Sequence, residues 1–127
     1  GERGSAQRLK LIANSMLGIT SAAAAELLAA GAALGLERAQ VFSVLVRFAP
    51  ALAARERGFL HDQHTPTMFA VRDLVKDLDL GLRVYGEKGA PTPLTLQARE
   101  LYAEALRESA DLDITAIVRG GTGARYP

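Results

Sequence analysis

Apolar side chains recur at three- and four-residue steps along most of this chain, which is the spacing of one face of an α-helix. The longest such pattern covers residues 7–34, and its apolar positions are Leu9, Ile12, Ala13, Met16, Leu17, Ile19, Ala23, Leu27, Ala30 and Leu34. A helix of that length would extend about 40 Å at 1.5 Å per residue. Such a helix exceeds what a small domain needs, so we expect it to pack against another subunit or domain.

Shorter helices are predicted for the rest of the chain. They cover residues 40–48, 51–57 and 66–87, with a polar connection at 58–63. Two more follow: one starts at 92 or 95 and ends near 109, and the last one starts after 111 or 113 and ends at 118. We find no convincing β-strand and no internal repeat in the sequence. The pattern therefore predicts one all-α domain, a helical bundle with a long first helix, over residues 1–118, and a flexible tail over residues 119–127.

Glycine, proline and capping side chains set the predicted boundaries. Gly35 is placed to end the first helix in the left-handed conformation. Thr65 followed by Pro66 predicts a helix start, because a hydroxyl can cap the first turn and proline fits its first position. Two boundaries stay open between neighbouring residues: Thr92 or Thr95 starts the helix that ends near residue 109, and Asp111 or Asp113 caps the last one.

Composition narrows the classes of function. The 127 residues carry 15 Lys and Arg against 14 Asp and Glu, and this net charge of +1 removes the main electrostatic argument for nucleic acid or an anionic membrane. The absence of Cys excludes a disulfide framework, a thiolate zinc site and a cysteine nucleophile. No apolar run approaches the roughly 20 residues that cross a bilayer, and no signal peptide is visible. We predict a cytoplasmic chain with no nucleic-acid or membrane partner.

Lys10 and Asn14 form the first candidate functional pair. They are four residues apart, so on a helix they share one face. An ammonium beside an amide can hold a hydroxyl or a carboxylate, and the lysine can transfer a proton. Taken alone, the pair is read more simply as the polar face of an amphipathic helix.

Phe69, Lys76 and Asp77 form the second candidate group. Phe69 and Lys76 are seven residues apart, two helical turns, so a helix would place both on one face with Asp77 one step round. That face could present a ring, a cation and a carboxylate to a ligand. The simpler alternative is a core phenylalanine beside a solvated Lys-Asp pair.

The remaining motifs predict no chemistry. His61 and His64 lie three residues apart in a segment that reads as a surface loop, and no third metal ligand is evident, so we predict no metal site. The glycine-rich stretch at residues 120–124 follows no strand and lacks the lysine of a phosphate-binding loop. No glycine fingerprint of a dinucleotide-binding domain occurs in the sequence.

Three segments, taken in order, resemble one family of enzymes. Residues 4–14 (GSAQRLKLIAN) resemble the Gly-x-Gly-x-x-x-Lys-x-x-Asn-Asn signature of the β-hydroxyacid dehydrogenases, which include 3-hydroxyisobutyrate dehydrogenase. Residues 69–80 resemble their segment in which a phenylalanine precedes Lys-Asp-Leu-x-Leu, and residues 90–117 resemble their closing helices. The similarity covers the C-terminal helical domain of that family, which has the fold of the 6-phosphogluconate dehydrogenase C-terminal domain.

The resemblance implies a role for each candidate. It makes Lys10 the catalytic acid or base and Asn14 a substrate-binding residue. Phe69, Lys76 and Asp77 would lie near the nicotinamide end of NAD or NADP. The cofactor would be held mainly by an N-terminal Rossmann domain that this chain does not contain. The expected substrate is a small hydroxy acid or aldehyde, and the expected assembly is a homodimer or a higher homo-oligomer.

Departures from the signature leave two alternatives open. Ala6 replaces the second signature glycine and Ala13 the first asparagine, while Arg47 and Phe48 stand where many relatives carry small polar residues. The bulky pair favours an unusual substrate. One alternative is a helical dimerisation module without catalysis. The other is an enzyme similar to the imine reductases, which commonly lack the lysine at the position of Lys10.

Overall fold

The computed structural model describes the backbone of residues 2–120 and the side chains of residues 4–120. Its elements, in chain order, are α1 (Glu2–Ala33), α2 (Arg38–Phe48), the 3₁₀ helix η1 (Pro50–Arg55), α3 (Glu56–His61), α4 (Val71–Glu87), α5 (Pro93–Ser109) and the 3₁₀ helix η2 (Ile114–Arg119). No strand occurs in this part of the chain, where strand-like pairing is limited to one antiparallel bridge between Ala70 and Asp113. The predicted all-α class is confirmed.

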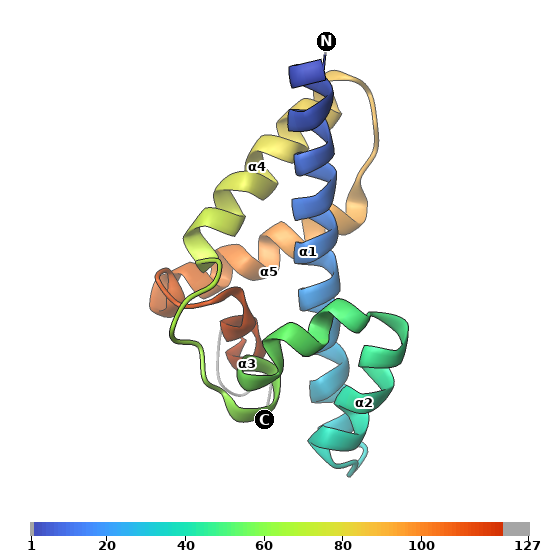
Figure 1. Cartoon of the computed structure of the whole chain (residues 1–127), viewed down its shortest axis with the longest axis vertical. Helices are drawn as coiled ribbons and strands as arrows, with labels where there is room; N and C mark the ends of the chain where they lie inside the picture. The colour runs from blue at the N-terminus through green and yellow to red at the C-terminus, as the bar shows by residue number, and fades with distance from the viewer. Residues whose placement is uncertain (1, 121–127) are drawn as a thin grey trace.

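α1 is the central helix of the fold. It runs through the molecule and packs against α2, α4, α5 and η2 (Figure 1). Its alanine-rich middle is buried, with Ala24 and Ala25 only 2% and 1% exposed. Small side chains let neighbouring helices approach α1 closely, and larger residues from those helices fill the core around it. The fully buried members of that core include Phe59, Leu74, Leu78, Tyr102, Ile114 and Ile117.

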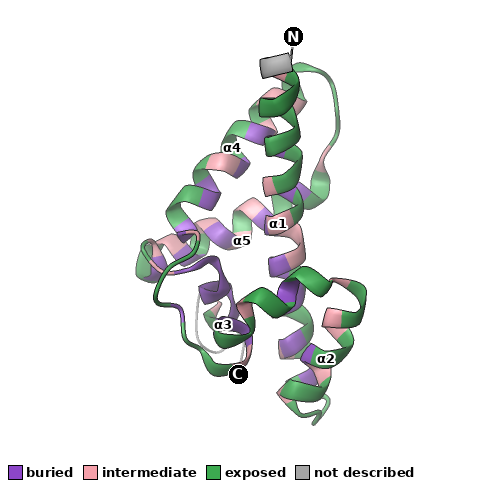
Figure 2. Cartoon of the chain, viewed as in Figure 1, coloured by how far each residue is buried: buried purple, intermediate pink, exposed green. Residues whose placement is uncertain are grey.

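The N-terminal part of α1 is much more exposed than its middle (Figure 2). Leu9, Ile12 and Met16 are 67%, 57% and 65% exposed. Gly4–Ala33 is long and apolar enough to span a membrane by length and composition, which differs from our expectation that no such run exists. The core helix of a globular domain passes the same test, and the contacts of α1 with four other elements give it that structural role.

Helix α4 begins at Val71, so the predicted start at Thr65 and Pro66 is wrong. The segment before α4 is held instead by Asp113, whose Oδ1 accepts hydrogen bonds from the backbone N–H groups of Met68 and Phe69, both at 3.1 Å. These bonds direct the backbone of residues 68–70 toward η2 and away from a helix. Phe69 therefore lies outside α4, and the predicted helix face shared by Phe69 and Lys76 does not exist.

The predicted polar connection at residues 58–63 is also wrong for residues 58–61, because α3 continues to His61. Gly58 and Phe59 are buried, and the Phe59 ring packs against Phe42 of α2 with a centroid separation of 5.9 Å. Arg38 Nε donates to the Phe59 carbonyl oxygen at 2.6 Å and ties α2 to α3. A buried phenylalanine and a buried glycine make this turn part of the core.

His64 is buried, with 3% exposure, which overturns the surface-loop interpretation for that residue. Its Nδ1 is hydrogen-bonded to Thr115 Oγ1 at 2.7 Å, and its Nε2 contacts Asp62. Among the residues described, no group of three His, Cys, Asp or Glu is arranged to hold a metal. His64 therefore joins the segment before α4 to η2.

Other boundaries agree with the local signals. Gly35 and Gly89 follow α1 and α4 with φ values of 79° and 74°. Asp113 caps η2 by accepting from the Thr115 N–H, which decides between the two open positions. The first part of the predicted tail is ordered as the end of η2 at Arg119, and residues 121–127 lie outside the described residues.

Candidate active site

An open cavity of about 660 Å³ lies between the N-terminal turns of α1 and the part of α4 from Asp77 to its C-terminal end. Its lining residues are Gly4, Gln7, Arg8, Lys10, Leu11, Asn14, Asp77, Leu80, Val84, Glu87 and Lys88. Three of the five residues predicted as functional, Lys10, Asn14 and Asp77, are in this set. The structure therefore brings residues from both candidate groups together.

Asn14 and Asp77 are in direct contact across the two helices. Asn14 Nδ2 donates a hydrogen bond to Asp77 Oδ2 at 2.9 Å, although the residues are 63 positions apart in sequence. Both side chains are half-buried. The bond fixes the orientation of the Asn14 amide, so that its oxygen and remaining N–H are available to a ligand.

Close packing of α1 on α4 positions that pair. A Cβ on Gly18 would lie 3.2 Å from Leu78, so the two helices approach each other tightly one turn beyond Asn14. Ser15 and Tyr85 share a hydrogen bond of 2.7 Å between their hydroxyl groups. Contacts on both sides of Asn14 therefore hold the helices in register.

Lys10 is exposed on the wall of this cavity. It forms no ion pair or hydrogen bond with any residue that the structure describes. The charged side chains in the lining are Arg8, Lys10 and Lys88 against Asp77 and Glu87. Three cations against two carboxylates leave a net positive wall, which favours an anionic ligand.

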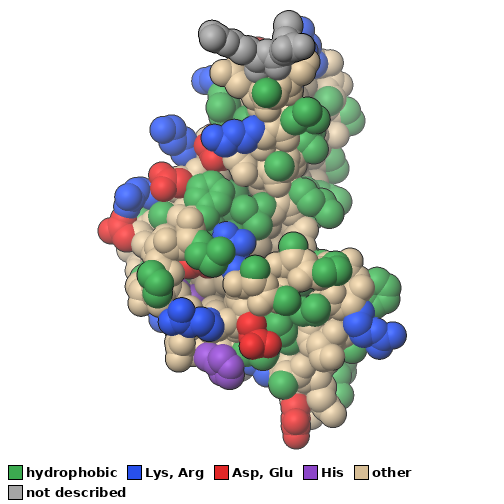
Figure 3. Space-filling model, viewed as in Figure 1, with side chains coloured by type: hydrophobic (Ala, Val, Ile, Leu, Met, Phe, Trp, Pro, Cys, Tyr) green, Lys and Arg blue, Asp and Glu red, His purple; other side chains and the backbone are tan. Residues whose placement is uncertain are grey.

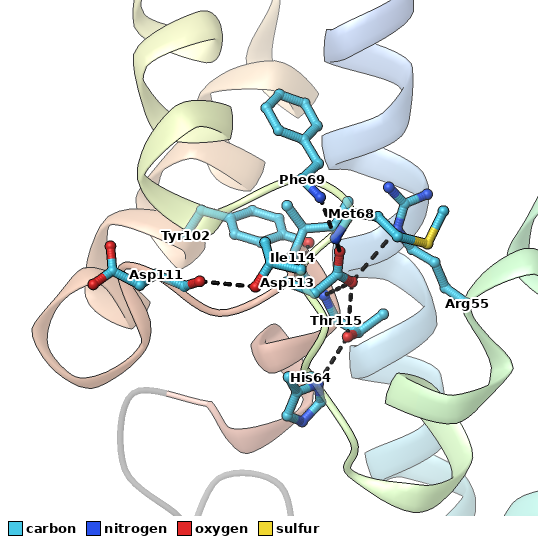
Figure 4. A network of polar contacts seen from close by, with 10 residues as sticks. Arg55, His64, Met68, Phe69, Tyr102, Asp111, Asp113, Ile114 and Thr115 are labelled. Atoms are coloured by element: carbon cyan, nitrogen blue, oxygen red, sulfur yellow. Dashed lines mark hydrogen bonds and ion pairs between the residues drawn. The ribbon is translucent and has the colours of Figure 1, made fainter.

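Phe69 and Lys76 are not among the residues that line this cavity. Phe69 is half-buried against the core, and its ring points away from Asp113 (Figure 4). Lys76 is exposed on α4. Within this chain the two residues are separate from the Lys10 cavity.

Eight further lining residues were not predicted, and four of them are polar or charged: Gln7, Arg8, Glu87 and Lys88. Gln7 and Arg8 lie in the first turns of α1, Glu87 is the last residue of α4, and Lys88 follows it. The two helices run in opposite directions (Figure 1), so their outer ends meet at the same place. Leu80 and Glu87 are seven residues apart, a spacing that indicates one shared face of α4. Only the packing of α1 on α4 shows which residues of α1 this face meets.

The perturbed carboxyl group lies elsewhere, where α2, α3 and η2 meet. Burial raises the pKa of Asp62, but hydrogen bonds and attraction from Arg119 and His64 outweigh burial and hold that pKa below its ordinary value. Burial also lowers the pKa of Arg38 against the opposing effect of Asp62. Asp62 accepts from Arg119 Nε at 3.0 Å, and this cluster joins elements of the fold.

Comparison with known proteins identifies the class to which this arrangement belongs. The family model described as NAD-binding of NADP-dependent 3-hydroxyisobutyrate dehydrogenase matches residues 4–120. The match covers nearly all described residues and indicates an NAD(P)-binding dehydrogenase sequence. The chain belongs to the 3-hydroxyisobutyrate dehydrogenase family. The family resemblance inferred from the motifs is confirmed at this level.

Two solved structures show the same fold. The 3-hydroxyisobutyrate dehydrogenase of Mycobacterium tuberculosis, described with L-serine, matches with a TM-score of 0.74 and 24% identity, over 87% of this chain and 41% of that one. The 3-hydroxyisobutyrate dehydrogenase of Salmonella typhimurium matches with a TM-score of 0.74 and 25% identity, over 87% of this chain and 40% of that one. The chain thus spans about 40% of the length of these structures. A comparison with curated proteins gave no match.

Proposed function

We propose that this chain is the C-terminal helical domain of an NAD(P)-dependent oxidoreductase that interconverts a small β-hydroxy acid and its semialdehyde. The proposal rests on one observation: Lys10, Asn14 and Asp77 line one cavity, and Asn14 is hydrogen-bonded to Asp77. The dehydrogenase family of the chain makes this cavity the expected place of the chemistry.

The residues present fit only one end of the cofactor. Dinucleotide phosphates are commonly bound by a glycine loop between a strand and a helix. Residues 2–120 contain no strand and therefore no such loop. Polar groups at the Lys10 cavity fit the nicotinamide end, so a second domain would hold the phosphates. This chain covers only 41% and 40% of the two solved relatives, so their chains are long enough to contain such a domain as well.

Each cavity residue has a distinct role in the proposed reaction. When bound, reduced nicotinamide would supply the hydride that the carbonyl carbon of the semialdehyde accepts. Lys10 donates a proton to the oxygen that becomes the hydroxyl, and its positive charge stabilises the negative charge developing there. Asn14 orients the substrate through its free amide atoms, and Asp77 keeps that amide in place. In the oxidation direction Lys10 accepts the hydroxyl proton.

An activity screen tests this function. The protein encoded together with its upstream sequence should oxidise NADH or NADPH in the presence of small semialdehydes, and reduce NAD or NADP in the presence of hydroxy acids. Cyclic imines are included in the screen. Turnover of imines alone would identify an imine reductase, and the absence of any turnover by folded, cofactor-loaded protein would favour a dimerisation module.

We also propose that α1 forms part of an interface between copies of the chain. Leu9, Ile12 and Met16 follow one another at steps of three and four and are more than half exposed. Apolar side chains gather over the upper part of α1 in the space-filling view (Figure 3). Exposed apolar stripes of this kind commonly mark association surfaces.

Light scattering at micromolar concentration tests that interface. A dimer would have twice the 13.5 kDa mass of the chain. Replacing both Leu9 and Ile12 by Gln should shift the protein toward the single-chain mass, whereas the same change at the exposed Leu96 of α5 should not. A mass of one chain for the unmodified protein would contradict the proposal.

A further inference from the structure

A second cavity, of about 260 Å³, lies between α1 and η1. Its lining residues are Ala13, Met16, Leu17, Thr20, Ser21, Ala51, Leu52 and Arg55. Most of these side chains are apolar, and the polar groups are two hydroxyls and one guanidinium. Neither Ser21 nor Arg55 belongs to a recognisable sequence motif.

Two of the polar groups are buried and lack hydrogen-bond partners. Ser21 is 1% exposed, and its Oγ has no partner. The Arg55 side chain is 15% exposed, and its Nε is buried without a hydrogen bond. Leaving such groups unsatisfied is costly, since each loses its bonds to water. Ser21 and Arg55 line the same cavity, so one ligand could contact both side chains.

Asp113 balances the charge of Arg55 without satisfying its hydrogen-bonding groups. Arg55 Nε lies 3.5 Å from Asp113 Oδ2. Asp113 Oδ1 already accepts from Met68 and Phe69, and Oδ2 accepts from Thr115 N at 3.1 Å and Thr115 Oγ1 at 2.9 Å. A carboxylate has about four acceptor sites, so this one is fully used.

The guanidinium is therefore positioned and left with free donors. The two terminal nitrogens of Arg55 point away from Asp113 (Figure 4). No residue that the structure describes accepts a hydrogen bond from them. A planar guanidinium with free N–H groups matches the two oxygens of a carboxylate.

We infer that this cavity binds the carboxylate of a small aliphatic acid. Arg55 donates to both carboxylate oxygens, and the Ser21 hydroxyl donates to one of them. Ala13, Leu17 and Leu52 surround the hydrocarbon part of the acid. The apolar walls favour an organic acid over an inorganic anion, and the volume is below the range typical of drug-sized ligands, about 300–1,000 Å³.

The position of the cavity suits the proposed reaction. Ala13 precedes Asn14 on α1 and lies one turn beyond Lys10, so the two cavities are on neighbouring faces of the same helix. Identifying the bound acid as the hydroxy-acid substrate of the enzyme rests on the proposed function. Carboxylate binding itself does not rest on it, because no cofactor takes part.

Amide chemical shifts of the chain, titrated with isobutyrate, test the inference. Saturable shifts are expected for Thr20, Ser21 and the residues of η1. Neutral isobutyramide, of the same shape, should cause none that saturate. Arg55→Met should weaken isobutyrate binding by about ten- to hundredfold, the effect of losing hydrogen bonds to a charged group. Arg107→Met, at an exposed position in the last turn of α5, is the matched control and should leave it unchanged.

Other outcomes overturn the inference. These are the absence of saturable shifts with isobutyrate, equal binding of isobutyramide, and unchanged binding in Arg55→Met. Should Arg55→Met fail to fold, Ser21→Ala gives the second test, and binding as tight as in the unmodified chain would count against the site. Failure of the proposed function would appear separately, as isobutyrate binding without turnover in the activity screen.

Discussion

Lys10→Ala should lower the kcat of the complete enzyme by at least about a hundredfold, which is the lower end of what positioned proton transfer contributes. Lys10 is the cation on the cavity wall nearest in sequence to Asn14, and Ala removes both its proton and its charge. Lys10→Arg should also be poorly active in the oxidation direction, because an arginine remains protonated and cannot act as a base. Steady-state rates in both directions measure these effects.

The control for this experiment is Arg107→Ala, at an exposed position in the last turn of α5. It removes a cation far from the cavity and should leave kcat and KM unchanged. A Lys10→Ala enzyme with the same kcat as the unmodified enzyme would exclude Lys10 as the general acid or base. The cavity would then be a binding site without that role.

Gly58→Ala should destabilise the fold by about 3 kcal/mol, the upper part of the range for overpacking a core. A Cβ at this position would lie 2.0 Å from Thr115 Oγ1 and 2.3 Å from Thr115 Cβ. Thr115 is 1% exposed and is hydrogen-bonded to Asp113 and His64, so it has no space to move aside. Urea unfolding followed by far-UV circular dichroism measures the free energy of unfolding.

Gly86→Ala is the matched control. Gly86 also lies within a helix, but a Cβ there would meet nothing within 4 Å. This substitution should raise the free energy of unfolding by about 0.5–1 kcal/mol, the usual difference between Ala and Gly in a helix. If Gly58→Ala unfolded at the same urea concentration as the unmodified chain, the close contact between α3 and η2 would be wrong.

The elements that the sequence predicted well are those fixed by local signals. The long first helix follows from its apolar spacing. Gly35 ends it because glycine, which has no Cβ, adopts the left-handed conformation without steric strain. The start of α4 was mispredicted because a residue far along the chain decides it. Asp113, 44 positions after Phe69, takes the N–H groups that a helix starting at Pro66 would have used.

The candidate site was predictable only in part. Helical spacing placed Lys10 beside Asn14, but no local pattern links Asn14 with Asp77, and the family resemblance supplied that connection. Phe69 was wrongly placed on a helix face for the reason given above. Arg55 and Ser21 could not be found from the sequence, because their importance comes from missing partners in the folded core.

The many contacts of Asp113 have an evolutionary consequence. This single carboxylate holds the backbone before α4, caps η2 and provides the countercharge for Arg55. A descendant that lost the acid would need to change several of these features at once. Positions 55, 113 and 115 are therefore expected to be inherited as a set, and homologues with a neutral residue at position 113 should also lack the arginine.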